Sequence, residues 1–187
     1  DFGIDEIVIN THYLSDKIEN YLKKKKFDLK INISKEKTIL DTGGGIFNAT
    51  KKFNTEPFIV LNPDTVWHKE HVKEFASLER IYFDKKVTAL LLVHRDKSYD
   101  KSFKGDFNLI EERLVNRNKF NEMIYTGAQV MSRKIFNNID IKHFSMNKIW
   151  NELIAKNLLV GFESNQEFLH INSKEIYQRL IKQKFTY

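Results

Sequence analysis

The chain has 187 residues, of which 41% are apolar and 13% aromatic, so it can bury one sizeable core and is not expected to be disordered. It contains no cysteine, which excludes disulfides and thiolate metal sites and is typical of a reducing cytosol. The net charge of +6 comes from lysines spread along the chain, and no apolar run is long enough to cross a bilayer. We therefore expect a soluble, cytoplasmic protein that binds neither nucleic acid nor a membrane.

The first part of the chain alternates strand-like and helical patterns. Short runs of β-branched residues predict strands, and apolar residues at helical spacing predict the helices between them. Ser15 or Thr11 is available to cap the first helix, and the second is expected to start directly after a glycine run. This βαβ order predicts a largely parallel, doubly wound sheet. The predicted strands are residues 4–10, 29–33 and 58–61, and the predicted helices are 14–22 and 45–53.

The second part of the chain is richer in strands. A nearly continuous apolar run at residues 87–93 predicts a central strand, which follows an amphipathic helix at 70–83. Only seven glycines and two prolines occur in the chain, and no stretch reads as a linker, so we expect a single domain over residues 1–187. The remaining predicted elements are strands at 107–110, 123–131, 158–162 and 167–171, and helices at 147–156 and 174–184.

The first candidate for a ligand-binding site is the glycine run Asp41-Thr42-Gly43-Gly44-Gly45-Ile46. Three consecutive glycines leave a backbone that a planar ring or a phosphate can approach closely. The run matches neither the Gly-x-Gly-x-x-Gly pattern of dinucleotide folds nor the Gly-Lys-Ser/Thr ending of a P-loop. The alternative is a tight turn between a strand and a helix, which needs only one or two glycines.

Asp64 is the second candidate, because it follows a short apolar strand and the dipeptide Asn62-Pro63. Sheets of this class often hold ligand or metal chemistry at the carboxyl ends of their strands. Mg²⁺ is commonly bound by one or two carboxylates together with phosphate oxygens and waters. The alternative is a turn aspartate that caps the next helix.

Five segments together carry a resemblance to a known family. They are Ile7–Asn10, Asp41–Ile46, Pro57–Asp64, Gly105–Phe107 and Tyr125–Ala128. In this order the set resembles the sugar-1-phosphate nucleotidyltransferases, most closely the N-acetylmuramate-1-phosphate uridylyltransferase and mannose-1-phosphate guanylyltransferase branch. The similarity extends from residue 4 to about residue 173. It implies an α/β fold with a Rossmann-like, doubly wound mixed sheet of the nucleotide-diphospho-sugar transferase type.

The resemblance also implies a reaction and a set of roles. A sugar-1-phosphate oxygen attacks the α-phosphorus of a nucleoside triphosphate, with UTP or GTP expected, and pyrophosphate leaves. Asp64 would be catalytic and would hold Mg²⁺. The nucleotide would contact Thr42, Gly43, Gly44, Gly45 and Asn62, while Asp106 and Gly127 would lie on the sugar side. For Asp106, a hairpin turn at Lys104-Gly105-Asp106 is the alternative.

The chain also departs from the family pattern. The family opens with a strand and a Gly-x-Gly-x-Arg loop that grips the triphosphate, and this sequence starts after that point. We therefore expect the first strand-loop-helix unit to be missing and transfer to be impaired in this form. The family's late Trp-x-Asp-x-Gly-Thr motif aligns with residues 168–173, so His170 replaces an aspartate that often binds metal. His170 is then a second candidate metal ligand; histidine is a poor ligand for Mg²⁺ but can donate a hydrogen bond to phosphate. Pro63 stands where glycine is common.

Two further readings of the sequence compete with an active enzyme. A non-catalytic module of the same fold would bind a nucleotide or an NDP-sugar. The missing loop and His170 favour this reading, whereas the glycine run and Asp64 favour the enzyme. A GT-A glycosyltransferase would normally show Asp-x-Asp at the strand end, which Asn62-Pro63-Asp64 does not. Among the other residues, His68 and His71 are expected on a solvated surface, and the two tryptophans are expected to be packing anchors.

Overall fold

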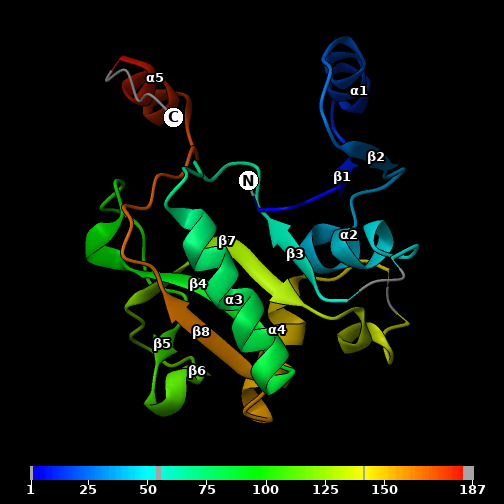
Figure 1. Ribbon diagram of the computed structural model, residues 1–187. Helices are drawn as coiled ribbons and strands as arrows, with labels where there is room; N and C mark the ends of the chain where they lie inside the picture. The colour runs from blue at the N-terminus through cyan, green and yellow to red at the C-terminus, as the bar shows by residue number, and fades with distance from the viewer. Residues whose placement is uncertain (1, 54–55, 141, 183–187) are drawn as a thin grey trace. The chain divides into compact units, whose positions relative to one another are not determined.

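The computed structural model describes residues 2–53, 56–140 and 142–182, and the chain divides into two compact units (Figure 1). The first unit comprises Asp1–Glu56 and Arg133–Glu152, and the second comprises Pro57–Ser132 and Leu153–Tyr187. Each unit has its own strands and packed side chains. Within the described residues, no helix is both long and apolar enough to cross a membrane.

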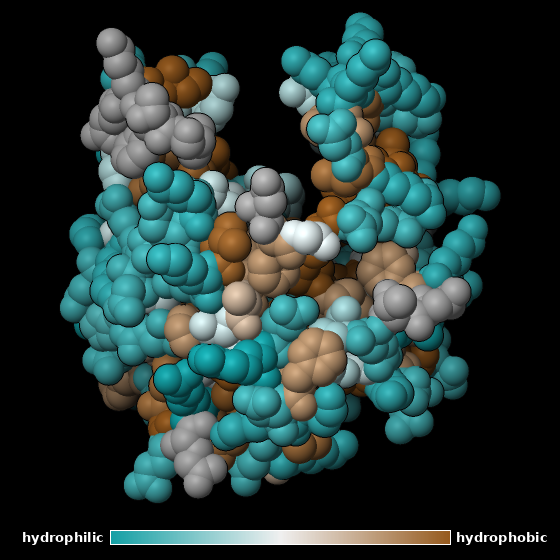
Figure 2. All heavy atoms as spheres, viewed as in Figure 1, coloured by the Kyte–Doolittle hydropathy of each residue, from teal (hydrophilic) through white to brown (hydrophobic). Residues whose placement is uncertain are grey.

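The first unit contains a parallel strand pair. Strand β1 (Glu6–Thr11) pairs with β2 (Lys30–Lys35), and helix α1 (Ser15–Lys24) connects them. The prediction that Ser15 or Thr11 caps α1 is wrong. The residue at the cap position is Leu14, which has a left-handed conformation and whose side chain makes no capping hydrogen bond. Asp16 lies in the first turn instead and pairs with Lys35 at 2.6 Å, which places a carboxylate near the positive end of the helix dipole. Hydrophilic side chains cover most of the visible face of α1 (Figure 2).

Helix α2 (Asp41–Ala49) starts earlier than the sequence predicts. The glycine run lies inside the helix, with Gly43, Gly44 and Gly45 all buried, and α2 packs against β1. Asp41 has a positive φ of 62° and directs its carboxylate to the backbone N–H of Thr42 at 2.5 Å. Phe47 on α2 packs against Phe136 and Phe144, with ring centroids 5.6 Å and 6.5 Å away. Helix α4 (Met146–Ala155) begins in this unit.

The second unit is built on a four-stranded sheet in the order β3-β7-β4-β8. Its pairs β3/β7 and β4/β7 are antiparallel, whereas β4/β8 is parallel. The expectation of a largely parallel sheet is therefore wrong here, because β7 pairs non-locally on both sides, while the mixed, doubly wound fold class is confirmed. The strands are β3 (Phe58–Leu61), β4 (Thr88–His94), β7 (Met123–Met131) and β8 (Leu159–Glu163).

Helix α3 (His71–Lys85) lies across one face of this sheet (Figure 1). It buries Phe75, Leu78 and Tyr82 and contacts β4, β7 and β8, while residues 88–93 of β4 are all buried. These apolar surfaces form the main core of the unit.

The last described helix belongs to the second unit and packs there in a separate apolar cluster. Helix α5 (Lys174–Lys182) places Ile176 and Leu180 in a cluster with Val66 and Leu169. A regular strand at 167–171 is not formed, because only isolated bridges occur there. The remaining short elements are β5 (Asn108–Leu109), β6 (Val115–Asn116), η1 (Arg95–Lys97), η2 (Glu111–Arg113) and η3 (Arg133–Phe136).

Candidate functional site

The side chains of Asp64 and His170 are in contact in the second unit although they are far apart in the sequence. The Nε2 atom of His170 lies 3.2 Å from Oδ2 of Asp64. Two backbone interactions set this geometry: Ile171 N donates to the Asp64 carbonyl oxygen at 2.7 Å, and Thr65 forms an antiparallel bridge with His170. Asp64, the metal ligand that the resemblance implies, therefore lies next to His170, which aligns with the aspartate of the family motif.

The Asp64–His170 pair retains unused polar atoms. Oδ1 of Asp64 and Nδ1 of His170 are buried and have no hydrogen-bond partner in the described part of the chain. A buried carboxylate oxygen without a donor is costly unless a cation or a ligand satisfies it. The unpartnered Oδ1 of Asp64 therefore fits a divalent cation, although no cluster of three or more metal-ligating side chains occurs among the described residues. The capping alternative for Asp64 is wrong, because α3 begins only at His71.

Asn62 and Gly127 lie side by side, one residue past the end of β3 and within β7. Asn62 N donates to the Gly127 carbonyl oxygen at 2.8 Å. Gly127 has a φ of +95°, and a Cβ atom added there would lie 2.6 Å from the Cβ of Asn62. The hydroxyl of Thr65 donates to the Thr126 carbonyl at 2.6 Å. The structure thus places the segment that carries Asn62 and Asp64 beside residues 126–127 of β7.

Asp106 also lies against β7. Its N–H donates to the Met123 carbonyl at 2.7 Å, and its carboxylate accepts from the Tyr125 N–H at 2.9 Å. The hairpin-turn alternative is therefore wrong. Burial raises the pKa of the Asp106 carboxyl, while the Tyr125 N–H and the Arg117 guanidinium act in the opposite direction. Arg117 is held in place by its Nε bond to the Asp106 carbonyl at 3.0 Å and by stacking over Phe107.

The glycine run in the first unit has a packing explanation at every position. A Cβ at Gly43 would collide with the Phe144 ring, and one at Gly44 would collide with the Lys142 carbonyl oxygen. At Gly45 it would come within 2.8 Å of the Asn10 amide nitrogen. The turn alternative is wrong, because the glycines lie within α2.

Thr42 has a structural partner as well. Its hydroxyl oxygen accepts a hydrogen bond from Met146 N at 3.0 Å, at the first residue of α4. It therefore satisfies one of the free N–H groups at that helix start. Nucleotide binding by Thr42 and by the glycines stays a prediction.

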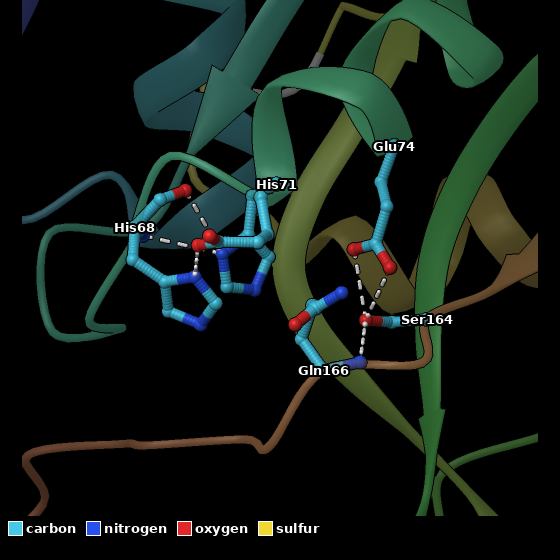
Figure 3. Close-up of polar contacts among 6 residues, drawn as sticks. His68, His71, Glu74, Ser164 and Gln166 are labelled. Carbon is cyan, nitrogen blue, oxygen red and sulfur yellow. Dashed lines mark hydrogen bonds and ion pairs between the residues drawn. The ribbon is translucent and has the colours of Figure 1, made fainter.

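The sequence did not reveal the environment of His71. This residue is buried, and its ring packs edge-on against Trp67 and near Phe75. The expectation of a solvated histidine pair is wrong for His71, which lies beside His68 (Figure 3). His68 is half-buried and pairs with Glu70 at 2.7 Å. Burial, followed by the neighbouring His68, lowers the pKa of His71.

Glu74 is a second feature that the sequence did not reveal. It is a buried carboxylate on α3 that accepts a hydrogen bond from the Ser164 hydroxyl at 2.8 Å (Figure 3). It also accepts a hydrogen bond from Asn165 N at 3.1 Å. Gln166 N donates in turn to the Ser164 hydroxyl at 3.1 Å. Glu74 therefore fixes the turn that leads from β8 toward His170. A carboxylate among the apolar positions of α3 is the only sequence signal for this role.

Comparison with known proteins identifies relatives along most of the chain. N-acetylmuramate alpha-1-phosphate uridylyltransferase of Caulobacter vibrioides is 25% identical over 92% of this chain and 75% of its own length. D-glycero-alpha-D-manno-heptose 1-phosphate guanylyltransferase of Aneurinibacillus thermoaerophilus is 26% identical over 71% of this chain and 48% of its own length. No protein-family model matches the chain.

Solved structures show the same fold. The HddC structure from Yersinia pseudotuberculosis complexed with GMP-PN superposes with a TM-score of 0.78 at 24% identity, covering 98% of this chain and 80% of the other. A UDP-glucose pyrophosphorylase complexed with UDP-glucose gives a TM-score of 0.70 at 13% identity, covering 98% and 83%. Together, the solved structures show that this chain has the fold of the nucleotide-diphospho-sugar transferases, and the curated relatives show that its sequence is similar to sugar-1-phosphate uridylyl- and guanylyltransferases.

Proposed function

We propose that this protein transfers a nucleotidyl group from a nucleoside triphosphate, UTP or GTP, to a sugar-1-phosphate in the cytoplasm. The observation that carries the proposal is the Asp64 carboxylate past the end of β3, with one buried oxygen that lacks a donor in the described structure. The relatives support it, since they are named as enzymes that act on sugar-1-phosphates.

Asp64 would hold a divalent cation, and the resemblance leads us to expect Mg²⁺. When bound, such an ion would neutralise charge on the phosphates. The chain's own residues would do the remaining work by positioning, which is the main requirement of phosphoryl chemistry. We assign Asn62, Thr42 and the glycines Gly43, Gly44 and Gly45 to the nucleotide, and Asp106 and Gly127 to the sugar.

A second candidate function is binding of a nucleotide or an NDP-sugar without turnover. His170 favours it, because an imidazole occupies the position at which the family has a metal-binding aspartate. The two functions make different predictions for one experiment, since only the enzyme releases pyrophosphate.

Pyrophosphate release from UTP and GTP with a divalent cation and a panel of sugar-1-phosphates tests the proposal. We expect release that depends on both substrates and is lost in Asp64→Ala. The matched control is Asp84→Ala, an exposed aspartate on α3. Nucleotide binding without release by a folded protein would favour the second candidate and contradict the first.

A further inference from the structure

We propose that the Asp64–His170 pair selects a first-row transition ion, such as Co²⁺ or Zn²⁺, over Mg²⁺. The inference rests on the proposed function in that it assumes a divalent cation at Asp64. It goes beyond that function because it assigns the identity of the ion to a residue specific to this chain, His170.

The chemistry of the two side chains supports this choice. Mg²⁺ takes oxygen ligands and gives up water reluctantly. An imidazole nitrogen is a preferred ligand for Co²⁺, Ni²⁺, Cu²⁺ and Zn²⁺, whose affinity for nitrogen sites exceeds that of the earlier divalent ions. A site with one carboxylate and one imidazole should therefore discriminate between the two classes of ion, whereas two carboxylates should do so much less.

The separation of the two side chains is compatible with joint ligation. Nε2 of His170 and Oδ2 of Asp64 are 3.2 Å apart. Two ligands at neighbouring positions of an ion, each at about 2.1 Å, are separated by roughly 3 Å. A modest adjustment of the two side chains would therefore admit an ion between them.

The orientation of the imidazole is fixed by its surroundings. Phe103 packs edge-on against His170 with ring centroids 5.3 Å apart, and Phe168 lies at 5.7 Å. Nδ1 is buried, so Nε2 is the ring nitrogen that faces Asp64. After His170, the Asn172 amide donates to the Asp100 carboxylate at 3.1 Å and ties down the segment that carries the imidazole. A ligand held in this way loses little freedom on binding.

Direct measurement of ion binding tests the inference. Mg²⁺ and Co²⁺ would each be titrated by calorimetry into the nucleotide-free protein, for the wild type, His170→Asp and His68→Gln. We expect the ratio of Co²⁺ to Mg²⁺ affinity to fall about tenfold or more in His170→Asp, the scale of effect that groups supporting a metal site usually have. His68→Gln controls for binding at another histidine and should leave the ratio unchanged.

A spectroscopic readout locates the ion. Adding Zn²⁺ to protein labelled with ¹⁵N-histidine should shift the Nε2 resonance that is missing from the His170→Asp spectrum. An unchanged affinity ratio in folded His170→Asp, or a Zn²⁺-induced shift only at other histidines, would overturn the inference. These outcomes are independent of turnover. Absence of pyrophosphate release would remove the proposed function, yet a changed ratio would still support ion selection by His170.

Discussion

Asp106 is solvent-exposed as a residue, yet neighbouring atoms partly desolvate its carboxyl group and so oppose its charge. Its pKa is raised by burial, and the raised value means that the folded protein holds this proton more tightly than the unfolded chain does. The contribution of Asp106 to stability is therefore lost as the pH rises through the range above its usual pKa of 3.8. Near neutral pH the charge does not favour the fold. We propose that this carboxylate accepts hydrogen bonds from sugar hydroxyls.

Asp106→Asn separates binding from stability. The amide oxygen can still accept from Tyr125 N, so we expect no loss of stability at neutral pH, as judged by the urea midpoint. If Asp106 binds sugar hydroxyls, kcat/KM for the sugar-1-phosphate should fall about tenfold, the effect of losing one good hydrogen bond to a charged group. An unchanged kcat/KM in the folded variant would remove Asp106 from the sugar side.

Alanine substitutions at Gly44 and Gly45 test the packing explanation for the glycine run. Gly44→Ala should destabilise by about 1–3 kcal/mol, because its Cβ would meet the fixed carbonyl of Lys142. Gly45→Ala should cost much less, because its Cβ would meet the movable ends of Asn10 and Glu36, and alanine is the better helix former. Chemical denaturation measures both. Equal losses in the two variants would contradict this explanation.

At the scale of elements, Glu74 joins α3 to the turn that follows β8. Glu74→Ala would leave the Ser164 hydroxyl and Asn165 N without their acceptor, so we expect a loss of about 1–3 kcal/mol in the free energy of unfolding. Glu79→Ala on the exposed side of α3 is the matched control and should change stability little. A loss no larger than that of the control would show that the buried carboxylate does not secure this turn.

His71, at the start of α3, should make the free energy of unfolding depend on pH. The pKa of His71 lies below its usual value of 6.5, so the unfolded chain binds its proton first as the pH falls. The stability contributed by neutral His71 is present above about 6.5 and decreases below it. Urea midpoints at about pH 7.5 and about pH 5.5 should differ less in His71→Gln than in the wild type. His143→Gln, at an exposed position, should retain the wild-type difference.

The sequence patterns predicted most helices and strands, because the formation of such an element depends mainly on residues that are close together in the chain. The predicted strand at 123–131 coincides with β7, and the apolar run at 87–93 is the central strand β4. The direction of pairing was not predictable in the same way, because β7 pairs with β3 and β4 through contacts between distant segments. For the same reason the contact of Asp64 with His170 could not be derived from spacing.

At the scale of the whole molecule, the chain passes between its two units at residues 56–57, 132–133 and 152–153. The glycine run belongs to the first unit, and Asn62, Asp64, Asp106, Gly127 and His170 belong to the second. We propose that the two units act as a single domain. The sequence motifs predicted the family, whereas the packing contacts of each glycine required the structure.

The central claim is that this chain forms an NDP-sugar. Mass spectrometry of reactions containing UTP or GTP, sugar-1-phosphates and Mg²⁺ or Co²⁺ tests it most directly. We predict an NDP-sugar and pyrophosphate in equal amounts with the wild type and with Asp84→Ala, and neither product with Asp64→Ala. Absence of NDP-sugar with every substrate pair, in protein that is folded and binds nucleotide, would contradict the claim.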